Sequence, residues 1–475
     1  MDLDDGNRYL LLGCLGSGMT ALAEILLDQG AVVSGMDAAV SPAVLADHPS
    51  RHLFDSLHPW SAEIDFHRFD VCVVSPAVDR NAVVVKTILA AGVPMVALPE
   101  AVARAFHRRR QICVAGTHGK STTAAMLAWI FERIGRPTGF FIGGRTRIAD
   151  RSGRWMPEGP VVLESCEYRQ SFLAFSPATV ILTGIERDHF DCYPQAADED
   201  RAFEAFVRRI PRDGTLICPT DCSRSSDIAG RTNSGKITFR VMTSDSTHQK
   251  AAADWTATNI RHYGCGSTFQ CLRRDGTEVE VSLNVPGVHN IANAVAAMAA
   301  AVGEGVRPQQ VAAALQDFSG VRRRFEHRGE IQGIVQIDDY AHHPTAVRQT
   351  LQAARRAFPN RKIIAVFEPH QVVRTRRFFL EFADALKSAD EILLLPVLAA
   401  RESSGFPECC RVSGDLVRHL NASGQKAYLL TDRNQVVSRI EDSGRPGDVL
   451  ITMGAGKTDL IHDELHRRFQ RHSVA

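Results

Sequence analysis

The segment QICVAGTHGKSTTAAMLAWIFERI spans residues 111–134 and joins two elements through a glycine-containing loop. Gln111–Ala115 is apolar enough to predict a buried strand, and the pattern of Thr122–Ile134 predicts a helix. Between them, GTHGKS (116–121) has glycines that let the backbone approach a polyphosphate. Amide groups and the dipole at a helix start favour that anion. Lys120 is suited to bridge the β- and γ-phosphates and the Ser121 hydroxyl to bind Mg²⁺, so the segment predicts ATP binding.

Lysine is scarce in this chain, which makes Lys120 informative. Only eight of the 55 basic residues are lysine. The loop departs from the common G-x-x-x-x-G-K-[ST] pattern because Val114 stands where that pattern has its first glycine. An ordinary strand–helix turn with a chance lysine is the competing interpretation. We favour the phosphate loop because a strand and a helix flank it.

Length and composition indicate a globular protein of about three domains. The chain has 475 residues, 44% of them hydrophobic and 23% charged, with 55 basic against 54 acidic residues. This balance gives no reason to expect a nucleic-acid partner. The apolar stretches fall short of the ~18 residues of a membrane span, so no membrane insertion is expected. No signal peptide is visible in the acidic start, and the eleven cysteines form no C-x-x-C pair, which favours a cytoplasmic location.

Strand and helix patterns alternate along most of the chain and predict an α/β protein of three domains. Residues 1–107 contain predicted strands at Tyr9–Leu12, Ala31–Met36 and Val71–Ser75 with a helix at Met19–Gln29. Residues 108–320 continue from the phosphate loop to a β-rich stretch at 213–285 and a helix at Gly287–Val302. Residues 321–475 alternate again, with predicted strands Ile334–Asp338, Lys362–Phe367, Glu391–Leu395 and Val449–Met453 and helices Thr345–Ala357, Arg376–Ser388 and Asp459–Phe469.

Two further glycine loops join a predicted strand to a helix. Gly13-x-x-Gly16-x-Gly18 is suited to hold a diphosphate at a helix start, and Asp37 ends the next strand, where a ribose-binding acid would lie. A plain tight turn competes with that interpretation. Gly454-Ala-Gly456-Lys457-Thr458 resembles a phosphate loop superficially, and we favour a turn that lines a cleft over a second nucleotide site.

Charged and imidazole side chains follow several predicted strands, where ligands bind in open parallel sheets. Glu164 ends one strand, and Asp188-His189 follows the next, so these groups are candidates for a magnesium site that keeps several waters. In the last third, Asp338, Tyr340, His342 and His343 follow one strand, while His370 and Arg374 follow another. Paired histidines and arginines suit an anionic or amine-bearing substrate.

These motifs together resemble the Mur ligases of peptidoglycan precursor synthesis. The resemblance covers nearly the whole chain. It is carried by GTHGKSTT (116–123), LESCEYRQSFL (163–173), TGIERDHFD (183–191), VPGVHNIANAVAA (285–297), GVRRRFEHRGE (320–330), DDYAHHPT (338–345) and MGAG (453–456). It implies an N-terminal Rossmann-like domain for a UDP-sugar, a central P-loop ATPase with a mixed or parallel sheet, and a C-terminal Rossmann-like domain.

The resemblance also implies substrates and residue roles. The reaction would join L-alanine to the lactyl carboxylate of UDP-N-acetylmuramate through an acyl phosphate, with ATP as co-substrate and Mg²⁺ as cofactor, in a monomer or weak homodimer. The metal ligands would be Ser121, Glu164 and His189. The catalytic residues would be Lys120, His342, His370 and Arg374. The remaining ATP-binding residues would be Gly116, Thr117, His118, Gly119, Thr122, Asn293, Arg324 and Asp338. The UDP-sugar would contact Gly13, Gly16, Ser17, Gly18, Met19, Asp37 and Ser75.

The choice among family members depends on a missing lysine and on several departures. Ligases that add later residues use a carbamylated lysine after the metal-binding histidine, but no lysine lies between Lys120 and Lys236. That absence agrees with the alanine-adding branch and also with a ligase that recycles murein tripeptide, L-Ala-D-Glu-diaminopimelate. The chain departs from the family pattern at Leu15 for glycine, CEYR (166–169) for DESD, Glu368 for glutamine, Gln371 for arginine, and Lys457.

Two other classes of protein remain alternatives. An NAD-dependent dehydrogenase built on the first glycine loop would leave GTHGKS (116–121) unexplained. A nucleotide-gated regulator without catalytic activity would bind ATP but form no amide product.

Overall fold

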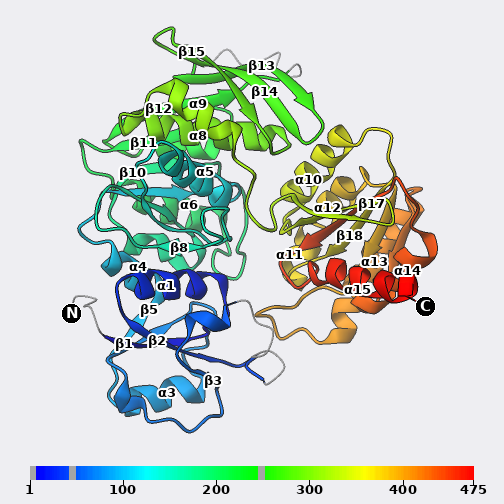
Figure 1. The fold of residues 1–475 in the computed structure, drawn as a ribbon, viewed down its shortest axis with the longest axis horizontal. Coiled ribbons are helices and arrows are strands. Elements are labelled where there is room, and N and C mark those ends of the chain that lie inside the picture. The colour runs from blue at the N-terminus through cyan, green and yellow to red at the C-terminus, as the bar shows by residue number, and fades with distance from the viewer. Residues whose placement is uncertain (1–6, 42–49, 244–251, 475) are drawn as a thin grey trace. The chain divides into compact units, whose positions relative to one another are not determined.

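The computed structural model describes residues 7–41, 50–243 and 252–474. Two compact units contain them: one holds the chain up to Ala257 with 271–279 and 292–315, and the other holds 258–270, 280–291 and the chain from Gln316. The described part has three sheets, coloured blue, cyan to green, and yellow to red in Figure 1. They confirm the predicted α/β class. The acidic start of the chain lies outside the described residues, and the domain boundaries after 107 and 320 stay predictions.

The first sheet has the order β3-β2-β1-β4-β5 with parallel neighbours. Its order reverses between β1 and β4, so the loops after these strands open at one point of the carboxyl edge. The three predicted strands and the helix of this region are confirmed. The elements are β1 (Arg8–Leu12), α1 (Ser17–Asp28), β2 (Val32–Asp37), η1 (Arg51–Leu53), β3 (Leu57–Pro59), η2 (Phe66–Arg68), β4 (Val71–Val74), α3 (Val83–Ala90), β5 (Met95–Ala97) and α4 (Leu98–Ala105).

The central sheet has the order β15-β14-β13-β12-β11-β10-β6-β9-β7-β8. Its internal strand β6 (Gln111–Ala115) pairs in parallel with β9 (Val161–Glu164) and β10 (Pro177–Leu182), and all five β6 residues are buried. The other strands are β7 (Gly139–Phe141), β8 (Gly153–Arg154), β11 (Thr215–Pro219), β12 (Gly235–Val241), β13 (Trp255–Tyr263), β14 (Gly266–Arg273) and β15 (Glu278–Leu283). The helices are α5 (Lys120–Arg133), η3 (Tyr168–Ala174), α6 (Ala196–Val207), α7 (Ser223–Ala229), α8 (Val288–Gly303) and α9 (Pro308–Gln316).

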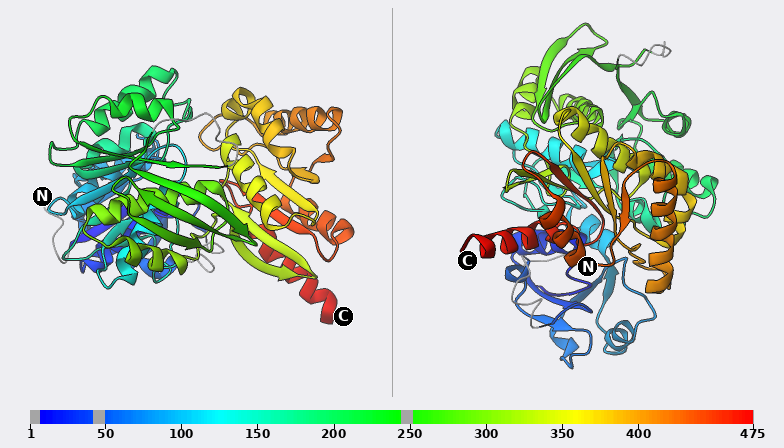
Figure 2. Two further views of the ribbon diagram at one scale, coloured as in Figure 1. Left: turned by 90° about the horizontal axis from the view of Figure 1, so that it is seen from above. Right: turned by 90° about the vertical axis from the view of Figure 1, so that its right-hand side faces the viewer.

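The last sheet has the order β16-β17-β21-β18-β19-β20 and is parallel except for the β16–β17 pair. Its helix α15 lies beside β16, as Figure 2 shows. The strands are β16 (Glu326–Ile331), β17 (Ile334–Asp339), β18 (Ile363–Glu368), β19 (Glu391–Leu394), β20 (Ala427–Leu429) and β21 (Val449–Gly454). The helices are α10 (Pro344–Ala357), α11 (Val372–Arg377), α12 (Phe379–Leu386), α13 (Phe406–Ala422), α14 (Arg433–Ser443) and α15 (Leu460–Val474).

The prediction of one helix over Arg376–Ser388 is wrong. Two helices occupy this stretch, and they meet at Phe378, whose backbone lies outside the helical region at φ −105° and ψ 28°. The Phe378 ring packs edge-on against His343, with 4.8 Å between ring centroids. Tertiary packing at this aromatic residue therefore accompanies a break that the helical periodicity of the sequence does not signal.

Within the first unit, α1 packs closely on β8. The carboxylate of Glu24 is buried and accepts hydrogen bonds from the backbone nitrogens of Ser152 (2.8 Å) and Gly153 (2.7 Å). A Cβ on Gly153 would overlap the backbone carbonyl of Ala21. This close approach joins the first sheet's helix layer to the central sheet, so the loops after β1 and β6 belong to one body.

Gly153→Ala should lower the free energy of unfolding by about 1–3 kcal/mol, because the added methyl meets backbone rather than a side chain that can move. Chemical denaturation measures this change. Gly303→Ala is the control, since a Cβ there meets nothing within 4 Å and alanine favours a helix. Equal stability of the two variants would contradict the close packing.

Candidate active site

The phosphate loop requires glycine at two positions. Gly116 follows β6 at φ +131°, and Gly119 precedes α5 at φ +79°, a region that favours glycine. A Cβ on Gly116 would overlap the Thr183 side chain, and one on Gly119 would overlap the amide oxygen of Asn293. No side chain caps the start of α5. The loop therefore brings bare backbone to a helix N-terminus, which is the arrangement that binds phosphate.

Lys120 makes a buried ion pair with a residue that the sequence analysis did not single out. Its Nζ lies 3.0 Å from Glu167 Oε2 and donates a 2.5 Å hydrogen bond to the Gly116 carbonyl. The Glu167 side chain is 1% exposed. Burial alone would raise the pKa of Glu167, but the Lys120 ammonium and the hydrogen bond from His189 outweigh it and lower that pKa to about 2. Glu167 is therefore a carboxylate at neutral pH.

The three residues predicted as metal ligands do not form one group, because two of them contact each other and the third contacts a different residue. The Ser121 hydroxyl donates to Glu164 Oε1 at 2.8 Å, and the Gly143 nitrogen donates to Glu164 Oε2 at 2.5 Å. Ser121 lies in the first turn of α5 and Glu164 ends β9, and their side chains are the hard oxygen donors that Mg²⁺ prefers, so the pair fits a magnesium ion. His189 instead contacts Glu167, with 3.1 Å between Nε2 and Oε1.

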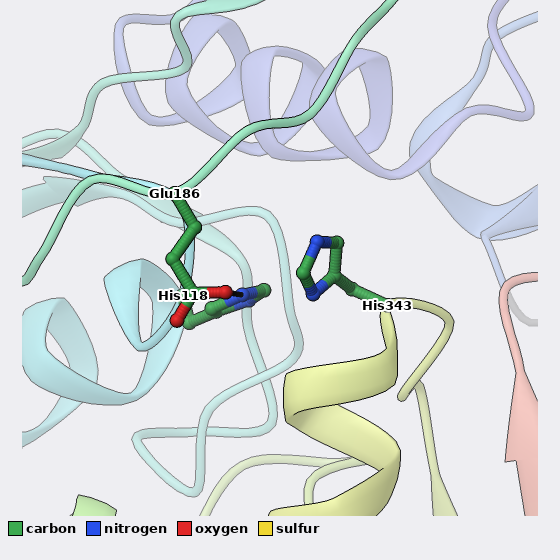
Figure 3. A group of neighbouring side chains, drawn as sticks. All are labelled: His118, Glu186 and His343. Carbon is green, nitrogen blue, oxygen red and sulfur yellow. Dashed lines mark ion pairs between the residues drawn. The ribbon is translucent and has the colours of Figure 1, made fainter. Parts of the chain in front are cut away.

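His118 and Glu186 extend the same edge of the central sheet. Figure 3 shows their side chains, with 3.5 Å between His118 Nε2 and Glu186 Oε2. The Thr117 hydroxyl donates to the Glu186 carbonyl, which ties the phosphate loop to the loop after β10. His343, also drawn in Figure 3, belongs to the second unit, where its Nδ1 accepts from the Thr345 nitrogen at the start of α10. Thr122 and Asn293 are both buried in the first unit.

The N-terminal glycine loop is built around Asp37. Its two carboxylate oxygens accept from the backbone nitrogens of Leu15 (3.1 Å) and Ala39 (3.0 Å). Gly13 lies at φ +82°, where a Cβ would stand 2.9 Å from the Ser75 Cβ. Gly16 and Ser17 are exposed and Gly18 is half-buried, whereas the Met19 side chain is 1% exposed within the core. The loop thus offers backbone at its surface, and contacts with a UDP-sugar stay a prediction.

A buried polar chain organises the second unit. Arg323, another residue that the sequence analysis did not single out, donates to Asp338 Oδ2 at 3.0 Å, and the Thr452 hydroxyl donates to Asp338 Oδ1 at 2.6 Å. Arg323 also donates to the carbonyls of Gly454 and Gly456. Burial raises the pKa of Asp338 to about 6, although Arg323 opposes the shift. The second glycine loop is therefore a turn held by an arginine, which agrees with the turn interpretation.

The other predicted residues of the second unit lie in a continuous row. The Arg324 guanidinium lies 5.1 Å from the Tyr340 ring centroid. The His342 ring lies edge-on to both the Tyr340 and His370 rings, at centroid distances of 5.3 and 5.5 Å. His370 Nδ1 lies 2.7 Å from an Arg374 nitrogen and must accept that hydrogen bond, because a guanidinium only donates. The structure thus brings together these site residues, which we predicted in the last third of the sequence.

Family models match along almost the whole described chain. The Mur ligase family catalytic domain matches residues 8–110, the Mur ligase middle domain 114–301, and the Mur ligase glutamate ligase domain 323–456. The UDP-N-acetylmuramate–L-alanine ligase of Roseiflexus sp. (strain RS-1) is 34% identical over 97% of this chain and 100% of its own length. That of Kineococcus radiotolerans is 36% identical over 96% of this chain and 95% of its own.

Solved structures give the same result. The UDP-N-acetylmuramate–alanine ligase of Thermotoga maritima aligns with a TM-score of 0.82 at 25% identity, over 98% of this chain and 100% of that one. A murein peptide ligase from Psychrobacter arcticus aligns with a TM-score of 0.72 at 26% identity, over 98% and 99%. The fold and site define an ATP-dependent ligase. The chain belongs to the Mur ligase family.

The Glu167 pair gives a prediction for the pH dependence of stability. Because the pKa of Glu167 falls from 4.5 to about 2 on folding, its contribution is present above pH 4.5 and is lost as pH falls through 2. Glu167→Gln should therefore lower the free energy of unfolding at pH 7 by on the order of 3 kcal/mol. The gap from wild type should shrink as the pH is lowered from 4.5 toward 2, as measured by chemical denaturation.

Glu278→Gln is the matched control, since Glu278 is exposed at the start of β15. A gap between wild type and Glu167→Gln that stays constant from pH 7 to pH 2 would contradict an ionised Glu167.

Proposed function

We propose that the protein joins L-alanine to the lactyl carboxylate of UDP-N-acetylmuramate at the expense of ATP. The observation that carries this proposal is the phosphate loop with Lys120 beside the Ser121–Glu164 oxygen pair, in a chain whose full-length relatives are named as this ligase. ATP and nucleotide sugars are cytoplasmic metabolites, so we place the reaction in the cytoplasm.

The first step activates a poor electrophile. A carboxylate carries a charge that repels a nucleophile, so its oxygen first attacks the γ-phosphorus of ATP and ADP leaves, which forms an acyl phosphate. Lys120 would exchange its contact with Glu167 for the β- and γ-phosphate oxygens, where it stabilises developing charge. A bound Mg²⁺, held by Ser121 and Glu164 with His189 as the predicted third ligand, would supply further positive charge to the phosphates.

The second step needs a proton acceptor, and hydrogen bonding favours His342. The uncharged amine of alanine attacks the acyl carbon, phosphate leaves, and the nitrogen must lose a proton. His342 Nδ1 lies 2.8 Å from the Tyr340 carbonyl and must donate to it, so the lone pair of a neutral ring is on Nε2. The His370 lone pair is instead engaged by Arg374. His342 is therefore the better base, and His370 orients Arg374.

Product formation tests the proposal. Mass spectrometry of a mixture of UDP-N-acetylmuramate, ATP, Mg²⁺, amino acids and L-Ala-D-Glu-diaminopimelate should show the L-alanine adduct. Lys120→Ala should abolish ADP release, whereas Lys236→Ala, at an exposed lysine of β12, should not. A tripeptide adduct as the main product would favour the murein-recycling alternative, and turnover by Lys120→Ala near the wild-type rate would place the site elsewhere.

Glu164→Ala should raise the Mg²⁺ concentration needed for half-maximal ADP release by about tenfold or more, because it removes a charged oxygen ligand beside Ser121. A Mg²⁺ titration of the rate measures this shift. Glu158→Ala, six residues earlier and exposed, is the control. An unchanged Mg²⁺ requirement would remove Glu164 from the metal site.

A further inference from the structure

A second group of ligating side chains lies beside the Ser121–Glu164 pair. Cys166 and Glu167 follow β9, and His189 follows β10, so the group comes from the two strands that flank β6. One ligand atom from each of the three residues lies within 4.8 Å of the other two. Ligands of one tetrahedral ion are about 3.5 Å apart for metal bonds of 2.0–2.3 Å, so small side-chain rotations would suffice to share an ion.

The three donors differ in kind from those of the magnesium pair. A thiolate, an imidazole and a carboxylate are ligands of Zn²⁺ and its softer relatives, whereas Mg²⁺ takes oxygen and retains water. Cys166 lies in the CEYR segment (166–169), which replaces the more acidic DESD pattern of the Mur ligases. The soft donor is therefore a feature of this chain's own sequence.

The negative charge of Glu167 and the hydrogen-bonding state of His189 favour a cation at this group, whereas burial raises the pKa of the Cys166 thiol to about 12, so the metal must displace the thiol proton. The Glu167 side chain is 1% exposed, and it already holds a cation, the Lys120 ammonium. His189 Nδ1 is buried and makes no hydrogen bond with any residue that the structure describes. The Cys166 thiol is therefore not an isolated cysteine, because a buried carboxylate and an imidazole ring lie close to it.

We propose that Cys166, Glu167 and His189 form a binding site for a thiophilic divalent cation, Zn²⁺ or Cd²⁺, which lies beside the Ser121–Glu164 pair and shares His189 with the proposed magnesium site. Binding releases the thiol proton to solvent and forms a metal–sulfur bond, with no change of oxidation state. The ion draws Glu167 away from Lys120, and its charge repels the ammonium. The expected consequence, which rests on the proposed function, is inhibition of ADP release by Zn²⁺ at concentrations far below those of Mg²⁺.

Cadmium titration of the full chain, without ATP or Mg²⁺, tests the site. The thiolate-to-cadmium charge-transfer band in the ultraviolet reports the Cd–S bond directly. Wild type should show a band that saturates at one ion per chain and is lost in Cys166→Ser. Cys265→Ser, at a half-buried cysteine outside any such group among the described residues, should keep the band.

Two more variants distinguish a metal site formed by several side chains from a single reactive cysteine. His189→Ala keeps the thiol and should weaken Cd²⁺ binding at least tenfold. Cys166→Asp keeps a negative charge and should lose the band, and its thermal unfolding shows whether the fold survives. Equal bands in wild type and Cys166→Ser, or Cd²⁺ affinity unchanged in His189→Ala, would overturn the proposal.

Inhibition of ADP release by Zn²⁺ is measured in a separate experiment. Zn²⁺ should inhibit ADP release by wild type at concentrations at least tenfold lower than those that inhibit Cys166→Ser. Failure of the proposed substrates to give any product would defeat the proposed function and leave the cadmium band unaffected, so the two failures are distinguishable.

Discussion

The buried pair of Lys120 and Glu167 is the interaction on which the candidate site depends. A carboxylate after β9 is removed from water and a lysine at the start of α5 is largely buried beside it, and each charge stabilises the other there. His189 joins the same carboxylate from the loop after β10. Three segments that diverge from adjacent strands are thereby joined at one charge.

This arrangement has a chemical meaning for a nucleotide site. In the proposed function, Glu167 presents to Lys120 the negative charge that a phosphate would otherwise supply, so the lysine would be held in place before ATP binds. Ser121 and Glu164 form a neighbouring contact built from oxygen alone. Hard and soft donors therefore stand side by side, and the substitution of Cys166 into this edge gives the proposed cation site its selectivity.

The second unit uses the same principle with different residues. Arg323 donates hydrogen bonds to a buried carboxylate and to two carbonyls of the glycine turn after β21, so its charge stabilises the fold of this unit. Glu368 packs against Gly456, where a Cβ would overlap its carboxylate. The Gly454–Gly456 turn thus looks like a phosphate loop in sequence, yet its carbonyls point to a guanidinium, which a phosphate site would not do.

The amino-acid sequence alone predicted the three α/β sheets, the phosphate loop and the positions of Glu164, His189, Asp338, His342 and His370 at or just after strand ends. It did so because apolar runs, glycine loops and strand ends are local patterns that parallel sheets translate directly into position. Only the tertiary structure revealed Glu167 and Arg323, since nothing local distinguishes a buried, paired charge from a solvated one. It also showed that the predicted helix is interrupted at Phe378 and that Asp37 accepts hydrogen bonds from the backbone of its own loop. Those outcomes depend on which side chains meet across strands, and that information lies in the packing.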